Sequence, residues 1–154
     1  MASGYEVVDK SHVGGQEQFA SEWKTIQVVF HDFAELPFER DDCTTSPNMK
    51  CHGLEWQIQL FPGGSSNSSE EDVFVSIYWC SKSCTATKKI RAKSKFRVPS
   101  AAMEGGGGKI DIHTPKRVWG QINYDKREDI LDSSKNYLVN GNLAVEVDIQ
   151  VMLD

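Results

Sequence analysis

The residue types that support metal binding or thiol chemistry are few and scattered in this chain. The cysteines are Cys43, Cys51, Cys80 and Cys84, and His52 directly follows Cys51. Two disulfides, a zinc site or four reduced thiols fit this set, although structural zinc sites usually repeat a C-x₂₋₄-C pair or add a spaced pair of histidines. Because the first residues lack the apolar segment of an export signal, we favour reduced, unreactive thiols and expect no bound metal.

Catalytic constellations are not recognisable in the sequence. It holds neither a G-x-S-x-G elbow nor an H-E-x-x-H motif, and its four histidines stand apart from one another. Glu70 and Glu71 are adjacent beside a serine-rich stretch, where two carboxylates do not acquire separate acid and base roles. Gly105–Gly108 lacks the Lys-Ser/Thr that follows a phosphate-binding loop, so we expect a flexible loop there. The sequence predicts a non-enzymatic domain without a cofactor.

Composition limits the class of protein further. The 154 residues include 17 Lys and Arg against 22 Asp and Glu, a formal net charge of −5, and 39% are hydrophobic. This length and composition predict one soluble globular domain. The acidic balance gives no overall attraction to nucleic acid or anionic lipid, and no apolar run is long enough to span a membrane. We therefore expect neither partner, and a cytoplasmic or nuclear location.

Strand-like alternation of apolar and polar residues is the dominant pattern. It is clearest in the runs Leu54–Leu60, Val73–Trp79, Ile90–Val98 and Leu143–Leu153. In each run the odd or the even positions form one apolar face, as a half-buried strand requires. Weaker strand candidates are Thr25–Phe30, Lys109–His113 and Val118–Tyr124.

Turn signals separate these runs, and helical signals are almost absent. Pro62-Gly63-Gly64 and Asn140-Gly141-Asn142 are turn sequences, and only Arg127–Asp132 suggests a helical turn. Short strands with alternating faces and little helix predict an all-β antiparallel sandwich. Residues 1–18 have no periodicity and are expected to be a flexible tail, which leaves residues 19–154 as the domain.

One predicted strand carries a row of cations. The side of Ile90–Val98 opposite the apolar face presents Arg91, Lys93, Lys95 and Arg97. Phosphate neutralisation would use such a row, but binding of single-stranded nucleic acid also needs aromatic rings between the cations, and this face has none. We favour a solvated strand face or one turned toward an acidic partner, including an acidic peptide.

Five motifs occur in a fixed order along the chain. They are Cys51–Gly64 with its Gly, Trp and Pro-Gly-Gly, Val75–Tyr78, Ile90–Phe96, Trp119-Gly120, and Arg127–Leu131 followed by Tyr137–Leu143. This order resembles the MATH (meprin and TRAF homology) family over roughly residues 19 to 153. The likeness in motif extends to the MATH domains of BTB/POZ-type ubiquitin-ligase substrate adaptors such as speckle-type POZ protein.

The resemblance implies an antiparallel sandwich of about eight strands that binds an extended peptide in a shallow groove. Trp56 is assigned to the core. Carried over position by position, the resemblance implies peptide-binding roles for Tyr78, Ser94, Asp111, Arg117, Trp119, Gly120 and Gln121. Ser94, Asp111 and Gln121 stand where the resemblance leads us to expect aromatic residues. The predicted groove is therefore more polar, and the predicted peptide differs accordingly.

The resemblance also implies a partner protein recognised through a short linear peptide. It further implies a link to a cullin ligase through a BTB domain that is not in this chain. One alternative is a carbohydrate-binding sandwich whose rings would be Tyr78, Trp79, Trp119 and Tyr124. Another is a TRAF-like signalling scaffold. Residues 1–18 show no heptad pattern, so we expect a monomer.

Overall fold

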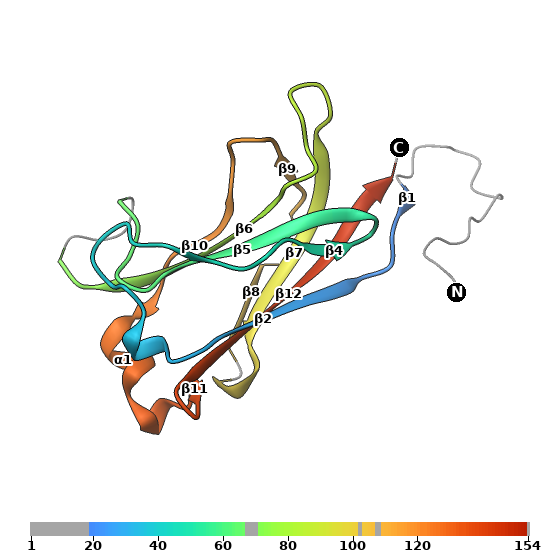
Figure 1. The fold of residues 1–154 in the computed structure, drawn as a ribbon. Helices are drawn as coiled ribbons and strands as arrows, with labels where there is room; N and C mark the ends of the chain where they lie inside the picture. Colours follow the sequence, from blue (N-terminus) through green and yellow to red (C-terminus); the bar gives the residue numbers. More distant parts are fainter. Residues whose placement is uncertain (1–18, 67–70, 102, 107–108, 154) are drawn as a thin grey trace.

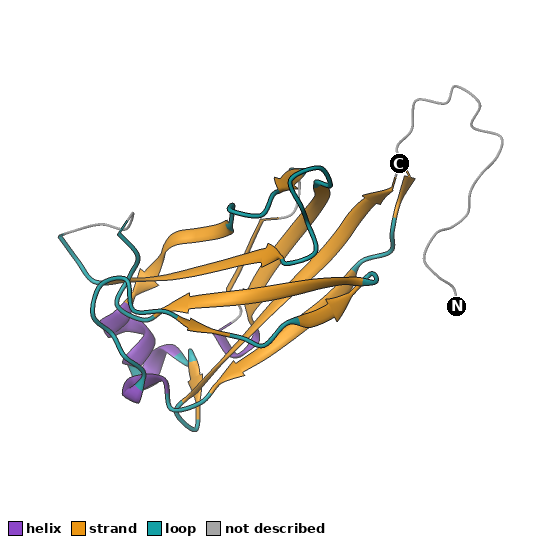
Figure 2. Cartoon of the chain, turned by 45° about the horizontal axis from the view of Figure 1, so that its top comes forward, coloured by secondary structure: helices purple, strands orange, loops and turns teal. Residues whose placement is uncertain are grey.

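The computed structural model describes residues 19–66, 71–101, 103–106 and 109–153, and the predicted tail at residues 1–18 lies outside them. Within these ranges twelve strands form two sheets that pack face to face, and a short helix lies at one end (Figures 1 and 2). Every strand pair is antiparallel. None of the helices in the described ranges is long and apolar enough to cross a bilayer.

The larger sheet is built around the last strand, β12. Because Leu143 is the register partner of both Leu138 and Phe30, β7 and β11 lie along one edge of β12, and β1 and β2 lie along the other. β8 and β9 pair with the far edge of β7. The seven strands are β1 (Phe19–Ala20), β2 (Lys24–Phe30), β7 (Ile90–Val98), β8 (Met103–Gly106), β9 (Asp111–His113), β11 (Leu138–Val139) and β12 (Asn142–Leu153).

The smaller sheet has the order β10-β6-β5-β3, with β4 also paired to β5. A two-residue turn joins β4 to β5, with His52 at φ 57° and Gly53 at φ 73°. Two successive positive φ values match the twist of a tight hairpin. The five strands are β3 (Thr44–Thr45), β4 (Met49–Cys51), β5 (Leu54–Phe61), β6 (Phe74–Ser81) and β10 (Trp119–Lys126).

The helical segments are short. The predicted helical turn is confirmed as α1 (Arg127–Leu131), which follows β10 directly. Single 3-10 turns occur at η1 (Phe33–Glu35), η2 (Pro99–Ala101) and η3 (Ser133–Lys135).

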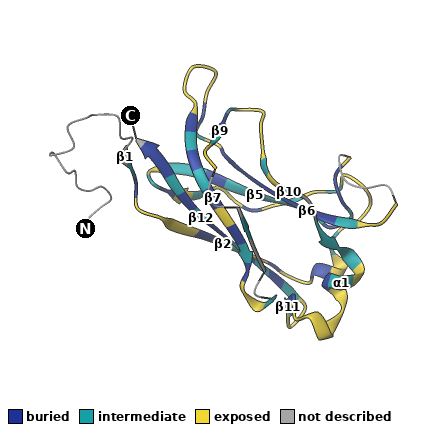
Figure 3. Ribbon diagram, turned by 180° about the vertical axis from the view of Figure 1, so that it is seen from behind, coloured by how far each residue is buried: buried dark blue, intermediate teal, exposed yellow. Residues whose placement is uncertain are grey.

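The core lies between the two sheets, and the alternation in the sequence accounts for it. Trp56, Ile58 and Leu60 of β5 are fully buried, and so are Leu143, Val145, Val147 and Ile149 of β12. Figure 3 shows buried segments in dark blue along β12. Full burial of one such side chain stabilises the fold by about 1.5–3 kcal/mol. The predicted all-β sandwich and the predicted core position of Trp56 are confirmed.

The strand β6 departs from its prediction in two ways. Val73 was expected on the apolar face, but the strand begins at Phe74 and Val73 is 52% exposed. The opposite face is buried as well, at Ser76, Tyr78 and Cys80. Alternation alone did not reveal this second buried face, because its residues are polar or amphipathic.

The glycine run is partly a strand, which corrects the expected flexible loop. Gly105 and Gly106 belong to β8, and Gly105 is the register partner of Phe96 on β7. A Cβ on Gly105 would lie 2.4 Å from an edge carbon of the Phe96 ring, so glycine makes room for that ring. Residues 107–108 lie outside the described residues.

Half of the row of cations on β7 is engaged by contacts within the fold. The Arg97 Nε donates to Glu146 Oε1 at 2.8 Å, and the Arg97 guanidinium also pairs with Asp148. These two carboxylates raise the pKa of Arg97 above its usual value. Lys95 lies 4.5 Å above the Trp23 ring. Two of the four cations are therefore engaged within the fold, which weakens the nucleic-acid interpretation further.

Candidate functional site

One long side of the sandwich is bounded by unpaired strand edges. Among the described strands, β8 and β9 pair only with β7, and β10 pairs only with β6. The segment 114–118 crosses from β9 in the larger sheet to β10 in the smaller sheet (Figure 1). We call the side bounded by β8, β9 and β10 the open side. Its outer edges carry backbone groups that are available for pairing with another chain.

Trp119 is the first residue of β10 and connects β10 to β9 across the open side. It is the register partner of Trp79, and its half-buried ring packs against the core. The indole Nε1 donates a hydrogen bond to the backbone oxygen of Ile112 at 3.2 Å. The guanidinium carbon of Arg117 lies 4.3 Å from the ring centroid, and Arg117 itself is exposed. The Trp119 ring therefore packs on the core with one part and contacts the exposed Arg117 cation with another.

Asp111 adds a negative charge beside this pair. Its side chain is half-buried on β9, and burial raises the pKa of its carboxyl above the usual value. The positive charges of Lys109 and Arg117 oppose that rise in pKa. Asp111, Arg117 and Trp119, three of the predicted site residues, are thus brought together by the β9–β10 crossing.

His113 lies directly behind Trp119 and was not singled out from the sequence. The side chain is fully buried, with its ring centroid 5.2 Å from that of Trp56 and 6.2 Å from that of Trp119. Neither ring nitrogen has a hydrogen-bond partner among the described residues. Burial lowers the pKa of His113 to about 4, so the ring is neutral at physiological pH. A lone histidine in an alternating run gives no sequence signal that its side chain is fully buried behind a tryptophan.

Further polar groups lie buried on the strands next to the open side. Ser94 is predicted to bind peptide, but it faces the interior from β7 and is 4% exposed. Its hydroxyl and the Trp79 Nε1 have no hydrogen-bond partner among the described residues. Leaving such a group unsatisfied costs about 1–3 kcal/mol. The interior beside the open side thus holds several unpaired polar groups.

The remaining predicted site residues divide between the two faces of the smaller sheet. By strand alternation Gln121 shares the face of Trp119, while Gly120 is paired with Tyr78 on the opposite face. Tyr78 is 7% exposed, and its hydroxyl lies 2.9 Å from Ser65 Oγ. A Cβ on Gly120 would lie 2.1 Å from the Ile77 carbonyl oxygen, so the close strand approach requires glycine. The seven residues do not form one continuous surface.

The family model of the MATH domain matches residues 26–149. The chain belongs to the MATH domain family. This confirms the predicted family and supports a protein-interaction module. A solved structure of Notothenia coriiceps TRAF5 is similar at 10% sequence identity, with a TM-score of 0.49, over 81% of this chain and 72% of that chain. No curated protein matches the chain.

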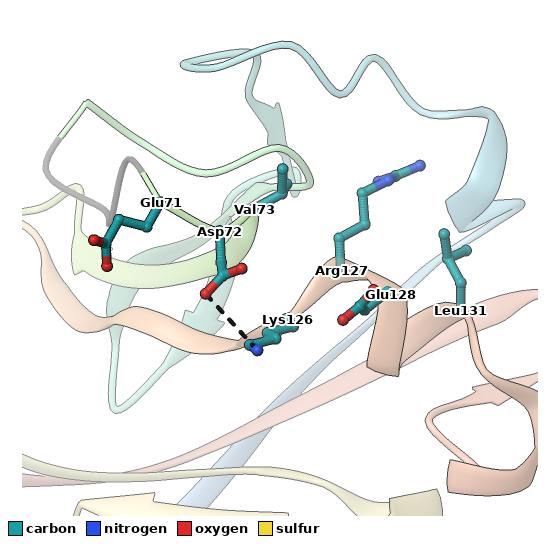
Figure 4. A pocket seen from close by; sticks show the side chains of 7 residues that line it. All are labelled: Glu71, Asp72, Val73, Lys126, Arg127, Glu128 and Leu131. Atoms are coloured by element: carbon teal, nitrogen blue, oxygen red, sulfur yellow. Dashed lines mark ion pairs between the residues drawn. The ribbon is translucent and has the colours of Figure 1, made fainter.

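The α1 end of this MATH domain holds a second arginine on aromatic rings. The Arg127 guanidinium carbon lies 4.2 Å from the Phe38 ring centroid and 5.2 Å from that of Phe33. Its Nη1 donates to the backbone oxygen of Pro62 at 3.2 Å. Arg127 borders two cavities of about 390 and 370 Å³. The larger is drawn in Figure 4, where Lys126 Nζ lies 3.7 Å from Asp72.

The cysteines of the domain are free thiols, and three of them are buried. Burial raises the pKa of Cys51 and Cys80, which lowers the fraction of reactive thiolate. In the described ranges no three His, Cys, Asp or Glu residues lie close enough to hold a metal ion. The carbohydrate alternative is weakened as well, because Tyr78 and Trp79 are buried and cannot stack on a sugar.

Proposed function

We propose that the open side of this MATH domain binds an extended peptide segment of a partner protein. The observation that carries the proposal is Trp119, a half-buried ring at the start of an edge strand with the exposed Arg117 stacked on it. An extended peptide adds to an edge strand through backbone hydrogen bonds, and its alternate side chains contact the groups that flank the strand. Trp and Arg are also the residues most enriched at energetic hot spots of interfaces.

The chemistry of the open side selects a polar peptide. Arg117 offers a planar fork of donors suited to a carboxylate or a backbone carbonyl, and Asp111 offers acceptors to a hydroxyl or an amine. Gln121 lies next along the same face of β10. The preferred segment is therefore a hydrogen-bonding sequence with an apolar or aromatic side chain placed against the Trp119 ring.

We further propose that the domain is the substrate-recognition part of a MATH-BTB adaptor for a cullin-based ubiquitin ligase, working in the cytoplasm or nucleus and without enzymatic activity of its own. Support comes from the motif order of Cys51–Gly64, Ile90–Phe96 and Trp119-Gly120. Ubiquitination of a peptide-bearing partner by the full-length protein, reconstituted with a cullin, tests this role. Absence of transfer with a bound partner would leave only the peptide-binding function.

The binding proposal is tested by selecting random linear peptides on the wild-type domain. Enriched peptides are then titrated against Trp119→Ala, Arg117→Ala and the matched control Trp23→Ala. The control removes another tryptophan that contacts a cation, Trp23, which is 37% exposed and lies in the connection between β1 and β2. We expect at least about tenfold weaker binding to both open-side variants, as at interface hot spots, and little change for the control. Equal binding to Trp119→Ala and the wild type would place the site elsewhere.

A further inference from the structure

A third cavity, of about 260 Å³, lies where the two sheets meet at the start of β7 and the end of β12. We call it the basic pocket. Its lining comes from the β4–β5 turn, the start of β5, the residues before β7, and β7 and β12 themselves. The lining residues are His52, Leu54, Lys88, Lys89, Ile90, Arg91, Val151 and Met152.

The wall of the basic pocket is fixed by a contact between the sheets. His52 is held in the left-handed region by the two-residue turn, and its Nε2 lies 2.8 Å from the backbone oxygen of Ile149 on β12. A carbonyl oxygen only accepts, so Nε2 is the donor in this bond. The contact ties the β4–β5 turn to the central strand of the other sheet. The pocket therefore has one rigid wall that does not depend on a ligand.

The charge of the basic pocket is of one sign. Lys88, Lys89 and Arg91 line it, and none of the described residues that line it is a carboxylate. Lys88 and Lys89 have exposed side chains and form no ion pair with a described residue. This contrasts with Arg97 on the same strand, which is held by two carboxylates, and with the net charge of −5 on the whole chain. Clustered cations of this kind attract an acidic ligand.

The floor of the basic pocket is apolar. Ile90 and Val151 are buried on the inward faces of β7 and β12, and Leu54 at the start of β5 is half-buried beside them. An inorganic anion would use only the cations and leave this floor without a contact. A cavity with apolar surface and a few placed charges instead fits a side chain that is itself apolar and has acidic neighbours.

We propose that the basic pocket is a second recognition site, which takes an acidic linear segment of a partner protein. A large apolar side chain of that segment lies on Leu54, Ile90 and Val151, and neighbouring Asp or Glu side chains pair with Lys88 and Lys89. The basic pocket and the peptide site at Trp119 use different residues, so a negative result at one site does not decide the other. It lies next to the open side, because Arg91 is the register partner of Ile112 on β9.

The test is a fluorescence anisotropy titration with a labelled nine-residue peptide. Its central Leu is flanked on each side by two Glu residues, with Ser and Gly at the ends. Two comparison peptides replace the Glu residues by Gln or the Leu by Ser. The protein variants are Lys88→Ala with Lys89→Ala, and a charge-matched control with Lys109→Ala and Lys116→Ala. Each pair removes two exposed lysines from the whole chain.

We expect the Glu-Leu peptide to bind the wild type and the control pair with equal affinity. Loss of Lys88 and Lys89 should weaken it about tenfold, because each partly exposed ion pair contributes at most about fivefold. The Gln peptide should bind about as weakly to the wild type, and the Ser peptide should also be weaker. A charge exchange sharpens the test: Lys88→Glu with Lys89→Glu should bind a peptide in which Lys replaces each Glu.

Three results would overturn the proposal. The first is equal binding of the Glu-Leu and Gln peptides to the wild type. The second is loss of binding in the Lys109 and Lys116 control rather than in the Lys88 and Lys89 variant, which would move the acidic ligand to the open side. The third is that the Lys88 and Lys89 substitutions weaken binding to vesicles containing phosphatidylserine more than they weaken binding to the peptide. That result would identify a lipid surface as the ligand.

Discussion

Two arginines at opposite ends of the domain make nearly the same contact with an aromatic ring. The guanidinium carbon of Arg117 lies 4.3 Å from the Trp119 centroid, and that of Arg127 lies 4.2 Å from the Phe38 centroid. Arg127 also contacts Phe33, donates to the Pro62 carbonyl and is half-buried, and burial lowers its pKa. Arg117 is exposed and stands beside Asp111.

The difference shows that the contact itself does not decide what an arginine does. Around Arg127 the same stack connects α1 to the loops at Phe33–Phe38 and Pro62. Arg127 therefore contributes mainly to the stability of the fold. Around Arg117 the same stack is made by an exposed side chain at the surface. An arginine of the second kind contributes little to folding and remains available to a ligand.

Acid should affect the Trp119 region most, because His113 is buried behind it. The pKa of His113 is about 4 in the folded state and about 6.5 when exposed, so the unfolded chain binds the proton first as pH falls. Stability should drop between about pH 6.5 and pH 4, by up to ~3 kcal/mol, and level off below. Urea unfolding at pH 7 and 4.5 measures the loss.

The control for this effect is His31→Gln, which removes an exposed histidine and should keep the full loss of stability. His113→Gln should remove most of it, because no imidazole is then buried. Carboxylates such as Asp111 and Asp148 titrate in both proteins, so the difference between the two slopes isolates His113. Parallel slopes would show that His113 is solvated or paired in solution.

Replacement of the anchored arginine is the next largest change. Arg127→Ala removes the bond to Pro62 and the stacks on Phe38 and Phe33, and should destabilise the domain by about 2 kcal/mol. Arg127→Lys keeps the charge and the aliphatic stem and should lose about half as much. Thermal and urea unfolding measure both. A neutral Arg127→Ala would make the two arginines equivalent and remove the contrast.

Replacement of the exposed Arg117 should change stability very little in the same unfolding measurements. Arg117→Ala is expected to change the free energy of unfolding by less than about 0.5 kcal/mol, because its stack on Trp119 is solvated. The same variant is expected to lose peptide binding at the open side. Destabilisation comparable to that of Arg127→Ala would instead assign Arg117 a structural role.

The smallest expected effect is electrostatic. The Arg117 charge opposes the rise in pKa that burial imposes on Asp111, so Arg117→Ala should raise that pKa further. An NMR titration of the Asp111 carboxyl carbon in wild type and variant measures the change, with Lys126→Ala at the other end of the domain as the control. An unchanged pKa would separate Asp111 from Arg117 in solution.

Local patterns predicted most of the fold. Alternation located the strands containing Trp56, Phe96 and Val147, because one face of each is buried, and Asn140-Gly141 located the hairpin before β12. The strand at Gly105 was missed because glycine there serves a neighbouring ring, and that contact depends on pairing with a distant strand. The buried outer face of β6 was missed for a related reason, since its cover comes from the loop at Ser65.

The placement of the candidate site residues was predicted less completely than the fold. Asp111, Arg117 and Trp119 meet as the motif order suggested, since they flank one short crossing. Ser94 and Tyr78 were placed in the groove by position along their strands, but which face a residue takes depends on how the sheets pack. The contact of Arg127 with two aromatic rings could not be predicted from the sequence, because Phe38 is 89 and Phe33 is 94 residues away along the chain.

The central position of β12 has a consequence for the order in which the chain can fold. Residues 24–30 and 143–149 are register partners, so the larger sheet joins segments from near both ends of the described chain. Contacts of such long range close slowly, because a large loop must be ordered before they form. During synthesis β2 and β7 emerge well before the strand that lies between them. Their free edges then remain exposed to misassembly until β12 arrives.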